Sequence, residues 1–377
     1  MNLELIDNIR LEANTKLNPS NKSILGQFMT PANIAEFMAS LLTEDNNVEL
    51  MDCGAGIGTL SIAAAKHLNN IQSIEQWEID PIMREYLANS IEALGLPFTI
   101  HSEDFIEDAV NNLLQGTGAR FTHAIINPPY KKINSNSTHR KLLRDVGIET
   151  VNLYTAFLAL TILLIKDGGQ IVAIIPRSFC NGSYYKPFRE LMMQHCAISH
   201  IHLFESRVSA FKDDDVLQEN IIIKLVKGES VTKVQVSSSE DNQFTNFKQY
   251  EFEPTDILSK NDPEKFIRIP TSDLHLEFGE SKLFEHTLGD LGLQVSTGPI
   301  VDFRSRQFLL SAPTNNSIPI PYPHHFVNGM IEYPKAHKKY PNAMVYDDSI
   351  RKQFWPAGYY VLIKRFSSKE ERRRVVA

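Results

Sequence analysis

The chain has 377 residues, of which 42% are hydrophobic and 22% charged, so it is long enough for about two globular domains. This composition excludes a disordered chain, a collagen-like repeat and a small disulfide-stapled domain. The formal net charge of -7 argues against a polyanionic partner, but the charge is unevenly distributed. Residues 301–377 hold thirteen Lys and Arg against six Asp and Glu, so this basic part is a candidate nucleic-acid or membrane surface.

The cysteines and the apolar segments indicate where the protein resides. The three cysteines form no Cys-x-x-Cys pair, which favours a reducing compartment and disfavours a zinc site. The N-terminus lacks the apolar core of a secretory signal, and the longest apolar stretch, residues 155–165, is about half a membrane span. The sequence therefore predicts a cytoplasmic protein without a metal site and without a membrane partner.

The first 240 residues alternate between strand and helix patterns. This alternation predicts an α/β fold with a mostly parallel, Rossmann-like sheet, in which ligands bind beyond the carboxyl ends of the strands. The expected helices begin at Thr59, Pro81, Asn152 and Ser183. The expected strands are Val48–Asp52, Ser73–Glu78, Thr122–Asn127, Gln170–Pro176, His200–Phe204 and Asn220–Val226.

A change in the sequence near residue 240 predicts a domain boundary. Six of the nineteen prolines fall between residues 313 and 341, and helical periodicity gives way to short segments with turn signals. We expect an α/β domain over residues 1–240 and a mixed, loop-rich domain over residues 241–377.

A glycine-rich loop follows the first expected strand. Residues 52–58, DCGAGIG, open a helix, and glycines at such a turn let backbone amides approach a ligand closely. Glu78 ends the next strand, where a ribose-binding carboxylate belongs. The Gly-x-Gly-x-Gly spacing that starts at Gly54 and Gly56 favours S-adenosylmethionine over a dinucleotide, because Asp52 beside it would repel a pyrophosphate. A tight turn without a ligand is the alternative.

Another acidic site lies between the expected strands Ser73–Glu78 and Thr122–Asn127. The carboxylate of Asp104 is suited to the amino group of an adenine, and Phe105 is suited to packing against the ring. Taken alone, these two residues are explained almost as well by a solvated loop.

The most specific motif is the tetrapeptide Asn127-Pro128-Pro129-Tyr130, which ends an apolar strand. Its two prolines stop strand pairing and fix a stiff turn. This turn holds two hydrogen-bond acceptors together, the Asn127 side-chain oxygen and the Pro128 carbonyl oxygen. One acceptor for each N–H of a planar amine favours a pyramidal nitrogen and directs its lone pair toward an electrophile. Tyr130 supplies an aromatic face for a planar substrate.

These motifs and their order resemble the adenine-N6 DNA methyltransferases of bacterial restriction-modification systems, in particular the TaqI-like and PstI-like groups. The resemblance covers most of residues 24–226 and includes the N-terminal segment GQFMTP at residues 26–31. It implies S-adenosyl-L-methionine as cofactor and N6 methylation of a flipped adenine in double-stranded DNA. By resemblance, the residues that contact the cofactor are Thr30, Pro31, Asp52, Gly54, Gly56, Glu78, Asp104 and Phe105. Those of the target-base site are Asn127, Pro128, Pro129 and Tyr130.

The resemblance also implies partners and a division of labour. Residues 1–240 would be the catalytic domain and residues 241–377 the target-recognition domain, with the basic clusters of the latter facing DNA. A cognate restriction endonuclease that shares the target sequence is the implied second partner. The family usually has a longer recognition region, so the sequence predicts that this domain is truncated.

Two other functions remain open from the sequence. The same tetrapeptide serves planar amides, so a protein glutamine or an RNA base is an alternative substrate. A DNA-binding subunit that keeps the fold without turnover is the other alternative, which the intact tetrapeptide and glycine loop disfavour.

Overall fold

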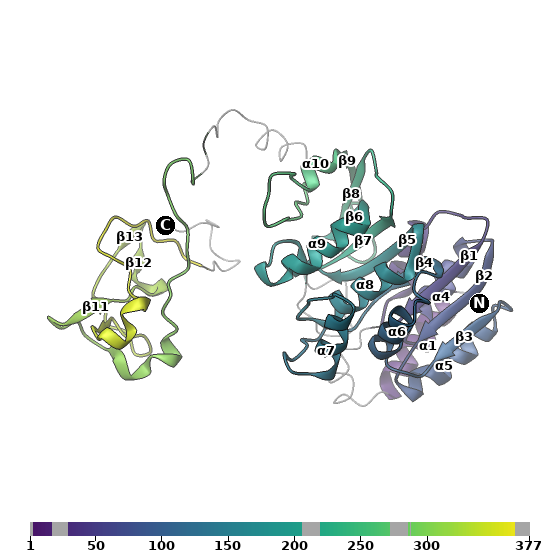
Figure 1. Cartoon of the computed structure of the whole chain (residues 1–377), viewed down its shortest axis with the longest axis horizontal. Helices are drawn as coiled ribbons and strands as arrows, with labels where there is room; N and C mark the ends of the chain where they lie inside the picture. The colour runs from purple at the N-terminus through teal and green to yellow at the C-terminus, as the bar shows by residue number, and fades with distance from the viewer. Residues whose placement is uncertain (1–2, 17–28, 206–218, 272–285, 287, 366–377) are drawn as a thin grey trace. The chain divides into compact units, whose positions relative to one another are not determined.

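A computed structural model describes residues 3–16, 29–205, 219–271, 286 and 288–365. The chain divides into two compact units, Met1–Ser281 and Lys282–Ala377 (Figure 1). The division falls later than the boundary expected at residue 240. The reason is that residues 248–252 form a strand that pairs with residues 234–239 at the edge of the first unit's sheet.

The first unit is built on a nine-stranded sheet with the order β3-β2-β1-β4-β5-β7-β6-β8-β9. Five of its eight strand pairs are parallel, and β7 runs antiparallel to both β5 and β6. The predicted α/β fold with a mostly parallel sheet is therefore confirmed. Its strands are β1 (Val48–Cys53), β2 (Ile71–Trp77), β3 (Phe98–His101), β4 (Phe121–Ile126), β5 (Ile165–Pro176), β6 (Cys196–Phe204), β7 (Asn220–Lys227), β8 (Val234–Ser239) and β9 (Lys248–Phe252).

Helices cover both faces of this sheet (Figure 1). One core lies under α6, α8 and α9, and the other under α3 and α4. Nearly all of α8 is buried, because its sequence LYTAFLALTILL is apolar around its whole circumference. In the part of the chain that the structure describes, no helix is long and apolar enough to cross a membrane. The helices are α1 (Leu3–Lys16), α3 (Ala32–Ser40), α4 (Thr59–His67), α5 (Pro81–Glu92), α6 (Phe105–Leu114), α7 (Thr138–Asp145), α8 (Leu153–Leu164), α9 (Lys186–His195) and α10 (Pro254–Ile257).

The glycine loop between β1 and α4 is held tightly against β2. The backbone amides of Gly54 and Ala55 both donate to the carbonyl of Trp77, at 2.9 and 3.0 Å. Gly58 is the N-cap of α4 with φ of 87°, and a Cβ there would lie 2.8 Å from the Leu87 side chain. Only glycine satisfies both the left-handed backbone and this close approach.

The tetrapeptide after β4 leaves the sheet abruptly, because neither Pro128 nor Pro129 has an N–H to donate. The chain that follows is fixed against the start of α8. Leu153 N donates to the Lys131 carbonyl at 2.7 Å, and Ile133 N donates to Val151 O at 2.8 Å. These bonds hold the segment after the tetrapeptide in place.

The second unit is loop-rich and mixed, with a small core around Ile320, Met344 and Ile350. It has a three-stranded antiparallel sheet, β10-β14-β11, and a two-stranded hairpin. The buried His325 is part of the packing of this unit. Its Nε2 forms a hydrogen bond with the Asn342 side-chain oxygen at 3.0 Å. The strands are β10 (Leu309–Leu310), β11 (Ser317–Pro319), β12 (Phe326–Val327), β13 (Met330–Ile331) and β14 (Ala343–Val345).

Candidate active site

A cavity of about 350 Å³ opens at the carboxyl ends of β1 to β4. Residues that directly follow these four strands line it, as expected for a ligand site in such a sheet. It joins the two motifs that the sequence predicted separately. The predicted site residues that line it are Thr30, Gly54, Gly56, Glu78, Asp104, Phe105, Asn127 and Pro129.

The other predicted site residues lie outside this lining. Pro31 is the N-cap of α3, and its carbonyl accepts from Ala35 N. Asp52 is fully buried at the end of β1. Pro128 is buried as well, and the Tyr130 hydroxyl points to the backbone of β5. Of the N-terminal segment 26–31, the first three residues lie outside the described part of the chain.

Asp52 is a buried carboxyl group with incomplete hydrogen bonding. Its Oδ2 accepts from the Ser61 hydroxyl at 2.8 Å, which also accepts from the Gln76 amide at 2.8 Å. Its Oδ1 is buried and has no hydrogen-bond partner among the residues that the structure describes. Burial, reinforced by the charge of Glu78, raises the pKa of Asp52 to about 7 despite the Ser61 bond.

Glu78 fixes the glycine loop as well as facing the cavity. Its Oε2 accepts from Gly56 N and its Oε1 from Asp80 N, both at 2.8 Å. Burial raises the pKa of Glu78 to about 7, and these two backbone bonds work in the opposite direction. The carboxylate therefore sets the loop geometry before any ligand binds.

These two raised pKa values predict a pH dependence of stability. Asp52 and Glu78 have pKa values of about 7 in the fold against ordinary values of 3.8 and 4.5. Their contribution is fully present below about pH 4 and is lost as pH rises through about 7, because ionisation is then costlier in the folded state. Thermal melts of Asp52→Asn should show a smaller loss of Tm between about pH 4 and pH 7 than the parent, because the unfolded and folded states differ in bound protons in that interval. Exposed Asp145→Asn is the control, and equal slopes for the parent and Asp52→Asn would contradict the raised pKa.

Asp104 caps α6 and pairs with a histidine from α7. Its Oδ1 accepts from Ile106 N at 2.9 Å and from Glu107 N at 3.3 Å, while its Oδ2 lies 3.2 Å from His139 Nε2. Burial favours a higher pKa, but the bond and charge of His139 with the two amides outweigh it, so the pKa of Asp104 is lowered. The same contact raises the pKa of His139. A ligand amino group at Asp104 would therefore share this carboxylate with His139.

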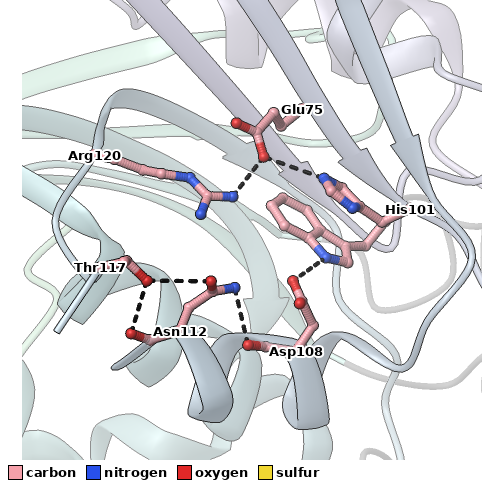
Figure 2. Close-up of polar contacts among 7 residues, drawn as sticks. Glu75, His101, Asp108, Asn112, Thr117 and Arg120 are labelled. Atoms are coloured by element: carbon pink, nitrogen blue, oxygen red, sulfur yellow. Dashed lines mark hydrogen bonds and ion pairs between the residues drawn. The ribbon is translucent and has the colours of Figure 1, made fainter. Parts of the chain in front are cut away.

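Aromatic side chains form one wall of the cavity. Phe105 lies 4.9 Å from Phe157 and 5.3 Å from Trp77, measured between ring centroids. The Trp77 indole N–H donates to Asp108 at 2.9 Å, and its ring stacks on His101 at 4.5 Å. Figure 2 shows how Glu75 and Arg120 extend this set of polar contacts. The contacts fix a flat apolar surface suited to a heteroaromatic ring.

The Asn127 side chain is held by Thr30 from the N-terminal segment and by Tyr130 of its own tetrapeptide. Its Nδ2 donates to Thr30 Oγ1 at 2.9 Å. The Tyr130 hydroxyl lies 3.0 Å from Asn127 Oδ1 and 3.0 Å from the Ile174 carbonyl, so its one proton can be donated to either oxygen. Gly54 stands close by, since a Cβ there would lie 3.8 Å from the Asn127 carbonyl. The glycine loop and the tetrapeptide therefore meet at one end of the cavity.

Several lining residues were missed as ligand contacts by sequence reasoning. Phe157 belongs to an apolar helix that has the pattern of core, so no local signal marks it. Ile79 is 48% exposed beside Glu78 and lines the cavity. Lys131, Lys132 and His139, which follow the tetrapeptide, also line the cavity. Their position after the tetrapeptide was the available signal.

The arrangement fits S-adenosyl-L-methionine. Close backbone at Gly54 and Gly56, the carboxylates of Glu78 and Asp104 and the aromatic wall match its methionine, ribose and adenine parts. The buried Asp52 Oδ1 behind the loop, which has no partner in the described part of the chain, suits a cationic ligand. Among the described residues, no group of three or more His, Cys, Asp or Glu is arranged to hold a metal ion.

Comparisons with known proteins agree with this geometry. Residues 33–211 match the family described as Eco57I restriction-modification methylase. The Type II methyltransferase M.BsuBI of Bacillus subtilis is 48% identical, over 100% of this chain and 77% of the relative. The Type II methyltransferase M.PstI of Providencia stuartii is 40% identical, over 99% of this chain and 77% of the relative.

The chain belongs to the restriction-modification methyltransferases. A crystal structure described as a type I restriction enzyme's modification subunit, from Vibrio vulnificus YJ016, shares the fold with a TM-score of 0.56. It is 13% identical, over 73% of this chain and 65% of that one. Membership of the restriction-modification methyltransferases confirms the resemblance, the enzyme class and the methyl donor S-adenosyl-L-methionine.

Proposed function

We propose that the chain methylates the N6 amino group of an adenine flipped out of duplex DNA, at a specific sequence, as the modification enzyme of a restriction-modification system. The observation that carries the proposal is the joining of the glycine loop and Asn127 in one cavity. A cognate endonuclease that reads the same sequence is the proposed partner. The N6 amine is paired inside a duplex, so the base must leave the stack to reach Asn127, at a cost of a few kcal/mol.

The proposed chemistry rests on acceptors and needs no strong base. Asn127 Oδ1 and the Pro128 carbonyl each accept one N–H of the adenine amine, which directs the nitrogen lone pair. Bound S-adenosyl-L-methionine supplies a methyl group that is already electrophilic. The Tyr130 ring, which lies outside the cavity lining, is proposed to contact the base, while its hydroxyl steadies Asn127 Oδ1. In-line placement then contributes most of the rate.

The cofactor is proposed to be held by residues that line the cavity together with two, Asp52 and Pro31, that lie behind its lining. Gly54, Gly56 and Asp52 are proposed for the methionine part, with Thr30 and Pro31 behind it. Glu78 is proposed for the ribose hydroxyls. Asp104 and Phe105 are proposed for the adenine, together with the lining residues Ile79 and Phe157.

The second unit is proposed to contact DNA. Its Lys338 and Lys339 are exposed, and Lys339 lies over the Tyr340 ring at 5.6 Å. Tyr340 stacks on Tyr322 at 4.8 Å and on His337 at 4.7 Å. A rigid aromatic stack beside exposed lysines suits phosphate and base contacts.

Labelled S-adenosyl-L-methionine, mixed-sequence duplex DNA and total RNA test the proposal in one reaction. We expect label in DNA, as N6-methyladenine after digestion to nucleosides. Sequencing the modified bases then gives the target site. Label in RNA or in protein glutamine would favour the alternative substrates, and salt-sensitive DNA binding without label would favour a subunit without turnover.

A further inference from the structure

Thr30 lies where the N-terminal segment meets the tetrapeptide. It is 5% exposed, and its Oγ1 accepts from Asn127 Nδ2 at 2.9 Å across 97 residues of sequence. Thr30 also lines the cavity. Its hydroxyl therefore stands between the cofactor site and the side chain proposed to activate the amine.

The two ends of the Asn127 amide are chemically different, and only one of them suits the reaction. A target amine presents N–H donors, so it needs Oδ1 and is repelled by Nδ2. With Nδ2 on Thr30, Oδ1 is left on the side of Tyr130, whose hydroxyl donates toward it at 3.0 Å. An oxygen accepts more than one hydrogen bond, so this contact is compatible with an incoming N–H.

Thr30 is itself held rigidly, which makes it an effective anchor. It directly precedes Pro31, the N-cap of α3, and Ala35 N closes the first turn on the Pro31 carbonyl at 3.0 Å. The helix buries Ile34 and Met38 completely against one face of the sheet. The Thr30 hydroxyl thus has a fixed position relative to β4.

We infer that Thr30 is a positioning residue for methyl transfer, which holds the Asn127 amide with its oxygen toward the target amine. This inference rests on the proposed role of Asn127. It goes beyond the cofactor contact that the family resemblance implies for Thr30, and it assigns the hydroxyl to the transfer step itself. Loss of the Thr30 hydroxyl should therefore change kcat more than it changes the affinity for the cofactor.

Thr30→Val tests this most directly, because valine keeps the branched shape and loses the acceptor. At saturating cofactor and DNA, kcat should fall about ten- to a hundredfold, since small misplacement of a reacting group costs that much. The Kd for S-adenosyl-L-methionine, measured by calorimetry, should rise by a smaller factor than kcat falls, because Thr30 is one of several residues proposed for the methionine part. Thr30→Ser restores the hydroxyl and should recover at least about half of the rate. Exposed Thr99→Val on β3 is the matched control for a Thr-to-Val change.

The outcomes separate this inference from the proposed function. An unchanged kcat in Thr30→Val, or a loss that appears in the cofactor Kd and not in kcat, would overturn the positioning role. If Thr30→Val fails to fold, as judged by its thermal melt, Thr30→Ser and Thr30→Ala carry the test, with low kcat expected for alanine alone. Asn127→Ala is assayed alongside, and full activity there would overturn the proposed function and this inference together. Loss in Asn127→Ala with normal Thr30→Val would overturn the inference alone.

Discussion

Asn127→Ala is expected to lower the rate of methyl transfer at least about a thousandfold, which is the largest effect of any single substitution in the cavity. The change removes the side-chain acceptor for the amine, and the Pro128 carbonyl alone cannot direct the lone pair. Affinity for S-adenosyl-L-methionine should stay within about threefold, because the residues proposed to hold the cofactor are untouched. Single-turnover transfer to DNA and calorimetry measure the two quantities.

The matched control is Asn89→Ala, an exposed asparagine on α5. It should transfer methyl groups at the parent rate. A thermal melt of Asn127→Ala shows whether the loss comes from unfolding, because its amide bonds to Thr30. Near-normal transfer by a folded Asn127→Ala protein would contradict the assignment of this residue to the amine.

Glu78→Ala is expected to weaken cofactor binding about ten- to a hundredfold, and this is the second large effect. Two causes act together. The ribose hydroxyls lose their proposed acceptor, and the backbone amides of Gly56 and Asp80 lose theirs, which loosens the glycine loop. Calorimetric titration with S-adenosyl-L-methionine measures the change.

The shape of the substitution series distinguishes the two causes. Glu78→Gln keeps one acceptor oxygen, so its affinity for S-adenosyl-L-methionine should lie between those of the parent and Glu78→Ala. Exposed Glu85→Ala on α5 is the control for loss of a carboxylate and should bind like the parent. Unchanged affinity in Glu78→Ala would exclude this carboxylate from the cofactor site.

The extent of the first unit was predicted less well than its fold. Strand and helix alternation identified β1, β2, β4, β5, β6 and β7, because each of those strands carries its own periodicity, whereas the short β3 was not among the expected strands. The compact unit runs to Ser281, past the boundary expected at residue 240. The strand β9 has exposed residues and joins the sheet only through pairing with β8, so its place depends on a partner and not on its own pattern.

Net charge is a second property that was hard to interpret from the whole sequence. A net charge of -7 for the whole chain is a poor guide to a DNA partner, because the basic residues are concentrated after residue 300. The carboxylates of Asp52, Glu78 and Asp104 belong to the cavity end of the sheet or lie just behind it. Charge for each compact unit is therefore the informative quantity.

By itself, the sequence determined the fold class, the glycine loop and the Asn127 tetrapeptide. These features are local, since glycine and proline restrict the backbone where they stand and strand and helix periods are read over a few residues. The tertiary structure alone decided that Thr30 bonds to Asn127, that the Tyr130 hydroxyl turns toward Asn127 Oδ1, and that His139 shares Asp104. Such contacts join residues far apart or depend on a side-chain torsion, and both are set by how the helices pack on the sheet.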